Sequence, residues 1–210
     1  MTEPAAALTD FALALECAVL ASRFPRRKIP DLTQRCGFRM LFAAAGVAAL
    51  VGGVYHGFLL EATRRVHNAT WLIIFAAAGI ASLACWGIAW SALLDQKGRV
   101  RDANLVGGVF FLIYLASALT RIQSFLSVLI ATSVAGVLLL AAYWSAYRRR
   151  RRHAATGIAG VLLVFAGSIV QRSRFDLHPS FTADALYHVL IGVALFLIYL
   201  SAPAVACDPH

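Results

Sequence analysis

Hydrophobic residues gather in seven long runs, separated by short segments that hold most of the charged residues. The runs cover residues 7–22, 38–60, 69–94, 103–119, 122–147, 154–170 and 181–202. A helix needs about 20 apolar residues to cross a bilayer, and the shorter runs still fall within the usual range. The fourth and fifth runs together are too long for one helix, so we expect a hairpin at Arg121. The pattern predicts an all-α polytopic membrane protein: one domain, residues 1–210, forming a bundle of seven transmembrane helices.

Composition supports this class. The chain is 60% hydrophobic, with a mean hydropathy of +0.75, which favours an integral membrane protein over a soluble domain. The net charge of +9 would also suit a protein that binds nucleic acid. However, the Lys and Arg residues lie in short clusters between apolar runs, as in membrane loops. We therefore expect a lipid bilayer and no nucleic acid as partner, and a bacterial inner (plasma) membrane as location.

Two further features of the sequence exclude other classes. The acidic residues Glu3 and Asp10 come early and the basic cluster follows the first run, an order unlike that of a cleaved signal peptide. The cysteines show no CxxC spacing, so no disulfide framework or thiolate metal site is expected. They are Cys17, Cys36, Cys85 and Cys207.

The distribution of positive charge predicts the orientation. Fourteen of the nineteen Lys and Arg residues lie in the segments before the second, fourth and sixth runs, and five lie on the opposite side. Because basic loops face the cytoplasm, we expect the N-terminus outside and the C-terminus inside. The densest cluster, Arg148 to Arg152, is expected to anchor the cytoplasmic end and to contact anionic lipids.

This orientation places the intramembrane polar residues at common depths. His56 falls near the outer end of the second run, while Asp184 and His188 lie in the first two turns of the seventh. Asp10 and His67 begin the first and third runs at the same level. The outer half should therefore hold nearly every intramembrane polar residue, and the cytoplasmic half should be almost featureless. Ionisable groups in membrane segments usually face the bundle interior or an aqueous cavity.

Three of these residues, His56, Asp184 and His188, form a set suited to metal binding. Asp184 and His188 are four residues apart and so share one face of a helix. Two imidazoles and a carboxylate suit zinc and leave a fourth position for water. Bound zinc lowers the pKa of that water to about 7 and polarises a carbonyl, as amide or ester hydrolysis requires. Asp10 or His67 would then act as the general base or support a metal ligand.

The seven spans, the His near the outer end of the second and the acid/His pair opening the seventh resemble the CREST superfamily. Its membrane hydrolases include alkaline ceramidases and progestin/adiponectin-receptor-like proteins. The family pattern is Ser-x-x-x-His in the second span, an Asp near the third and His-x-x-x-His in the seventh, with zinc on the three His.

The chain departs from this pattern at three positions. Gly52-x-x-x-His56 keeps the His and lacks the Ser, and Asp184-x-x-x-His188 has Asp for the first His. The head of the third span offers His67 and Asn68 in place of the Asp. The resemblance implies a zinc-dependent hydrolase with a lipid amide or ester as substrate.

Other functions use the same polar residues. His56 and His188 would serve as axial ligands of haem b, or the cluster would line the outer cavity of a transporter. A third alternative is a non-catalytic subunit that packs against partner chains in a membrane complex. A retinal protein is disfavoured, because Lys28 and Lys97 both lie between runs and no intramembrane Lys can form a Schiff base. For each residue taken alone, packing or a hydrogen bond to a neighbouring helix is an equally good explanation.

Overall fold

Seven α-helices form the fold in a computed structural model that describes residues 3–24, 29, 31–94, 97–120, 125–174, 176–178 and 181–206. They are α1 (Pro4–Ser22), α2 (Leu32–Val54), α3 (Arg64–Leu93), α4 (Lys97–Thr120), α5 (Phe125–Arg148), α6 (Ala154–Ser173) and α7 (Ala183–Ser201). A π-helix, η1 (Tyr55–Leu59), continues α2, and a 3-10 helix, η2 (Ala202–Val205), follows α7. All seven are long and apolar enough to cross a membrane. The predicted all-α, seven-helix class is confirmed to that extent.

Several helices begin a few residues before the apolar runs from which they were predicted. The second run begins at residue 38, yet α2 begins at Leu32 because the Asp31 carboxylate caps it, accepting a hydrogen bond from the Gln34 N–H at 2.8 Å. Pro4 opens α1, a position where its missing N–H is not needed. Hydropathy misses such polar helix ends. The predicted hairpin at Arg121, with residues 122–124, lies outside the described residues.

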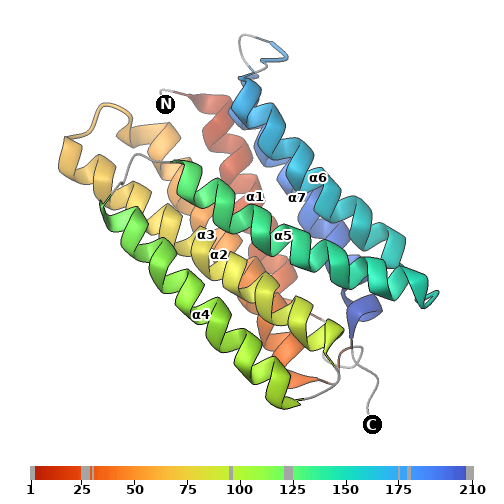
Figure 1. Ribbon diagram of the computed structural model, residues 1–210. Coiled ribbons are helices and arrows are strands. Elements are labelled where there is room, and N and C mark those ends of the chain that lie inside the picture. Colours follow the sequence, from red (N-terminus) through yellow and green to blue (C-terminus); the bar gives the residue numbers. More distant parts are fainter. Residues whose placement is uncertain are drawn as a thin grey trace.

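The order of the helices brings distant parts of the chain to one end of the bundle. α1 packs against α2 and α7, α3 packs against α2, α4 and α5, and α6 packs against α5 and α7 (Figure 1). Because the chain runs up and down, α1, α3 and α7 begin at the end where η1 and α6 finish. We call this the N-terminal end of the bundle.

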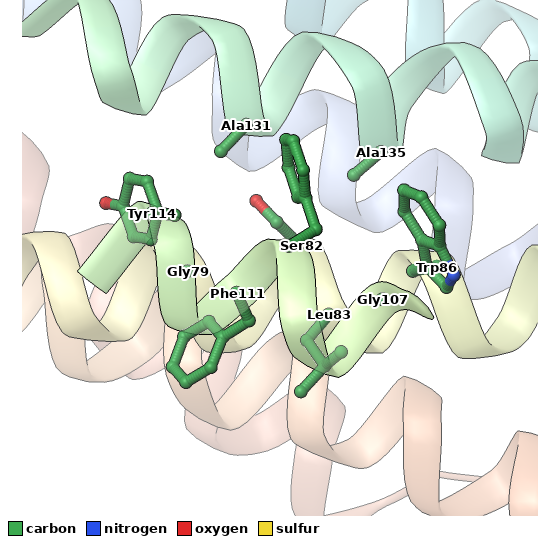
Figure 2. Close-up of a pocket in the computed structure, with 10 residues that line it drawn as sticks. Gly79, Ser82, Leu83, Trp86, Gly107, Phe111, Tyr114, Ala131 and Ala135 are labelled. Carbon is green, nitrogen blue, oxygen red and sulfur yellow. The ribbon is translucent and has the colours of Figure 1, made fainter. Parts of the chain in front are cut away.

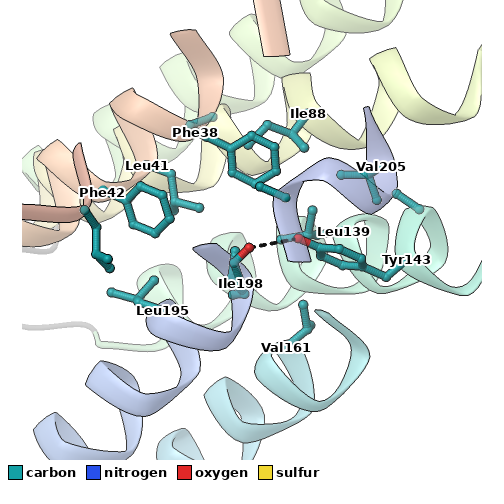
Figure 3. Packing of buried hydrophobic residues seen from close by; sticks show 14 of the residues in the cluster. Phe38, Leu41, Phe42, Ile88, Leu139, Tyr143, Val161, Leu195, Ile198 and Val205 are labelled. Atoms are coloured by element: carbon teal, nitrogen blue, oxygen red, sulfur yellow. Dashed lines mark hydrogen bonds between the residues drawn. The ribbon is translucent and has the colours of Figure 1, made fainter. Parts of the chain in front are cut away.

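The larger hydrophobic core fills the middle and the opposite end of the bundle, and Figure 3 shows part of its packing from close by. Tyr143 and Ser201 are buried there and joined by a hydrogen bond of 3.0 Å. The buried Gln34 amide donates to the Val205 carbonyl at 3.0 Å, because the chain folds back after α7 and its backbone needs a partner. The end of the bundle opposite the N-terminal end, which we expected to be cytoplasmic and almost featureless, therefore does contain buried polar contacts. The core includes Phe38, Phe42, Ile88, Leu139, Val161, Leu195 and Ile198.

A small pocket lies between α3, α4 and α5, away from the N-terminal end (Figure 2). Its lining is mostly aromatic and small apolar groups. Its polar side-chain groups already have backbone partners: the Trp86 indole N–H donates to Ala103 O at 2.9 Å, the Tyr114 hydroxyl to Phe75 O at 2.7 Å and the Ser82 hydroxyl to Ala78 O at 2.9 Å. The pocket therefore offers no free polar group among the described side chains to orient a ligand.

The contact between α5 and α6 gives a test of this packing. The Tyr143 ring lies directly over Gly157, so that an added Cβ would collide with it, whereas nothing lies within 4 Å of a Cβ added at Gly108. We expect G157A to lose about 1–3 kcal/mol of stability by overpacking. G108A, in α4, should change little or gain slightly from helix propensity. Thermal unfolding in detergent, followed by circular dichroism, measures both, and equal melting temperatures would contradict the packing.

Candidate metal site

Three ligating side chains from separate segments meet at the N-terminal end of the bundle. Glu3 precedes α1, His56 is the second residue of η1 and Asp184 lies in the first turn of α7. One ligand atom of each lies within 4.8 Å of the others, and all three residues are partly buried. Glu3 Oε2 and His56 Nδ1 are 2.6 Å apart. We call Glu3, His56 and Asp184 the ligand triad.

Two helix ends position Glu3 against His56. The carbonyls of a final helical turn have no donor within the helix. The His56 carbonyl, in the π-helix that ends the α2 segment, accepts a hydrogen bond from the Glu3 N–H at 3.2 Å. This bond joins the end of η1 to the start of α1. It holds the Glu3 carboxylate beside the imidazole.

Caps and a neighbouring helix hold Asp184. The Asp176 carboxylate accepts from the Ala183 N–H at 2.7 Å and so fixes the start of α7. A carboxylate in the first turn of a helix is favoured by the helix dipole, and Asp184 has that position. Gln171, near the end of α6, donates to Asp184 Oδ1 at 3.3 Å. One Asp184 oxygen is thus tied to α6.

His188 lies beside the triad, but its ring nitrogens face α1. Its ring centroid is 6.1 Å from that of His56. His188 Nε2 is 3.2 Å from Asp10 Oδ1, and His188 Nδ1 is 3.2 Å from Thr9 Oγ1. The predicted set of His56, Asp184 and His188 is thus brought to one place, while the third ligand atom near His56 and Asp184 comes from Glu3.

Asp10 lies buried between α1, α2 and α7. The residue is 2% exposed, and its Oδ2 has no hydrogen-bond partner among the described residues. A Cβ added at Gly52 would lie 2.8 Å from that oxygen. Gly52 is the position where the CREST pattern has Ser. The missing side chain leaves the space that the Asp10 carboxyl occupies.

His67 lies on the far side of Tyr55 from the triad. Its Nδ1 is 3.0 Å from the Tyr55 hydroxyl, and its ring also contacts Trp71. The Tyr55 ring in turn contacts both His56 and His67. A general-base role for His67 stays a prediction, because its polar contact in the structure is with Tyr55.

Glu3 is the residue that the hydropathy pattern missed. The first apolar run starts at Ala7, so Glu3 counted only as part of an acidic N-terminus. A signal was present: Glu3 and Asp10 are seven residues apart, which puts them on one face of a helix extended back to Pro4.

The donor set of the triad fits a divalent metal ion. Imidazole nitrogen and carboxylate oxygen are the usual non-thiolate ligands of zinc. Around a tetrahedral zinc, neighbouring ligand atoms lie about 3.3 Å apart, and the triad atoms, within 4.8 Å of one another, need only small movements. The Glu3–His56 separation of 2.6 Å is a hydrogen-bond length, so a metal would replace the proton between them.

Comparison with known proteins identifies the family. The model of a family of unknown function (DUF6962) matches residues 5–206, and the chain belongs to that family. The match includes His56, Asp184, Asp10 and His188, and it begins just after Glu3. No curated protein matches the chain.

Proposed function

We propose that this DUF6962 protein is an integral membrane hydrolase that depends on zinc and cleaves a lipid amide or ester. The observation that carries the proposal is the convergence of Glu3, His56 and Asp184, with one ligand atom of each within 4.8 Å of the others. The resemblance to the CREST hydrolases, based on His56 and His188, supports the same reaction class.

The triad would hold the metal, and other residues would orient its members. Glu3, His56 and Asp184 would supply one ligand atom each, which would leave a fourth position for water. When bound, zinc supplies an activated water and polarises a carbonyl. Gln171, 3.3 Å from Asp184 Oδ1, fixes that carboxylate. The interaction between η1 and α1, through the Glu3 N–H and the His56 carbonyl, fixes the other two.

The proposed position in the membrane rests on charge and depth. Seven apolar helices support insertion, and the basic segments favour an outside N-terminus in a bacterial inner membrane. The triad then lies at the level of the outer membrane–water interface, where the ester and amide linkages of lipids also lie. Exposed apolar side chains at the same end, Leu8, Phe58 and Leu177, suit a lipid substrate.

The opposite end would contact anionic lipids through Arg148–Arg152. Four of these side chains are exposed, while Arg151 donates to the Ala206 carbonyl at 3.1 Å. One arginine of the cluster thus fixes the segment after α7, and the others are free to meet lipid phosphates.

Haem b is less well supported. Both ring nitrogens of His188 lie 3.2 Å from polar atoms of α1, on Thr9 and Asp10. His56 Nδ1 is 2.6 Å from a Glu3 carboxylate oxygen. These contacts favour a small cation over an apolar macrocycle.

Elemental analysis of the purified protein tests the metal site. We expect about one zinc per chain in the wild type, with H56A and D184N losing almost all of it because each removes one of three protein ligands. E3Q, which removes the charge of the third ligand, should lose zinc to the same extent as D184N. The control is E61Q, which removes an exposed carboxylate near the end of η1. Metal-free wild type, or equal loss of zinc in E61Q and H56A, would contradict the site.

Hydrolysis is tested on the same variants in liposomes containing fluorogenic lipid amides and esters. The wild type should release fatty acid, a chelator should stop the release and added zinc should restore it. H56A should show less than about 1% of wild-type activity, because the ligand set is incomplete. A wild type that binds zinc but cleaves none of these lipids would contradict the proposed hydrolase activity, and only the metal-binding part of the proposal would remain.

Orientation is tested by labelling introduced cysteines with a membrane-impermeant maleimide. E61C, beside the end of η1, should be labelled on intact cells. H153C, in the turn between α5 and α6, should be labelled only after permeabilisation, since basic segments stay inside. Labelling is read against the parent protein with its native cysteines. The reverse pattern would place the site on the cytoplasmic side.

A further inference from the structure

We propose that Asp10 and His188 form a latch that positions α1, so that Glu3 meets His56 and Asp184. In this role both are positioning residues and act on the metal through Glu3. The inference rests on the proposed metal site for its purpose. With or without a metal, the latch would determine where α1 lies against α7.

The latch joins α1 to α7 through side chains that are almost fully buried. The side chains of Asp10 and His188 are 3% and 9% exposed, and they lie 3.2 Å apart. Thr9 adds a second contact from the same turn of α1, with its hydroxyl 3.2 Å from His188 Nδ1. Each nitrogen of the His188 ring therefore lies against a polar atom of α1.

Fixing Asp10 also fixes Glu3. The two residues are seven apart, which is about two helical turns or 10 Å along one face. A rotation of α1 by one residue, about 100°, would carry Asp10 away from His188 and Glu3 away from His56. Glu3 lies at a helix end, where fraying is ordinary, so its single backbone bond to the His56 carbonyl needs the support of a buried contact two turns deeper.

Gly52 completes the latch from the side of α2. The Asp10 carboxyl lies between the His188 ring and the Gly52 backbone, and a Cβ at Gly52 would lie 2.8 Å from Oδ2. The carboxyl is thus fixed between α2 and α7, the two segments that lead to His56 and Asp184.

Burying the Asp10 carboxyl costs free energy, and this cost indicates that the residue does more than fill space. Asp10 Oδ2 is buried and has no hydrogen-bond partner among the described residues, which is unfavourable for a carboxyl group. Replacing a buried polar pair by apolar groups is often neutral or stabilising. A chain selected only for packing would do better with apolar residues at both positions of the pair. Functional sites are where proteins break such local rules.

The first experiment measures zinc affinity by competition with a chelator. D10N keeps the shape and a polar contact to His188 and should bind nearly as wild type. D10L and G52A should bind at least about tenfold more weakly, the effect usual for residues that support a metal ligand. The double variant D10L/H188L should bind zinc as weakly as D10L and yet keep or raise the melting temperature, because it replaces both partners of the buried pair by apolar groups. A role in stability alone would lower both quantities together.

A glycine from the same interface supplies the matched control. Gly46 also lies on α2 facing α1, and an added Cβ would lie 3.0 Å from Cys17 Cβ, away from the triad. G46A should therefore disturb the α1–α2 contact and leave zinc affinity unchanged. Equal weakening in G46A and G52A, or wild-type affinity in D10L, would overturn the latch.

The second experiment works without metal. A chain carrying E3C and D184C is treated with a short bifunctional thiol reagent, and the linked peptides are measured by mass spectrometry. The two thiols should be linked readily in this chain, more slowly when D10L is also present, and at nearly the original rate when D10N stands in place of D10L.

The two readouts separate the claims. If linking depends on Asp10 but the wild type binds no zinc, the metal function fails and the latch stands. If the wild type binds zinc but the rate of linking is the same with and without D10L, the latch fails and the metal site stands.

Discussion

The structure depends on one constraint: a polar side chain within an apolar helix must find a partner inside the protein. Short hydroxyls find it one turn back in their own helix, as Thr70 and Ser82 do, whereas longer polar side chains must reach a neighbouring helix. Neither a protein core nor a bilayer offers water to replace a missing contact. Tyr143 meets Ser201 and Asp10 meets His188, in each case across helices. Tyr114 reaches a backbone carbonyl of α3. The few polar residues therefore decide which helix faces meet, while the abundant apolar residues fill the space between them.

The same constraint has different results at the two ends of the bundle. At the end opposite the triad, Gln34 and Arg151 donate to backbone carbonyls of the segment after α7, and those contacts close the fold. At the N-terminal end, the two carboxylates of Glu3 and Asp184 lie with one oxygen each within 4.8 Å of an imidazole nitrogen of His56 and of one another. Saturated polar contacts stabilise a fold, whereas acceptors gathered without enough donors attract a cation. This contrast is what makes the N-terminal end the candidate site.

Hydropathy predicts depth well and rotation poorly, and this explains which parts of the site could be predicted. The run lengths and loop charges bring His56, Asp184 and His188 to one level, and the structure has them together at one end. Which way a ring points is another matter. His188 turns its nitrogens to α1 because Gly52 lets that helix approach with Asp10. The hydropathy pattern did not predict Glu3 as a ligand, because helix ends carry polar residues that no apolar run includes.

The departures from the CREST pattern are connected by space and chemistry. A Ser at position 52 would put its Cβ 2.8 Å from the Asp10 carboxyl, so the Gly there and the acid on α1 belong to one arrangement. With Asp184 in place of a His and Glu3 beside His56, the triad holds two carboxylates and one imidazole. Carboxylate-rich sets accept harder cations such as Mn²⁺ more readily than three imidazoles do. The proposed metal site thus has a ligand set of a different character from the three His of the CREST pattern, and in the proposed latch its geometry depends on the placement of α1.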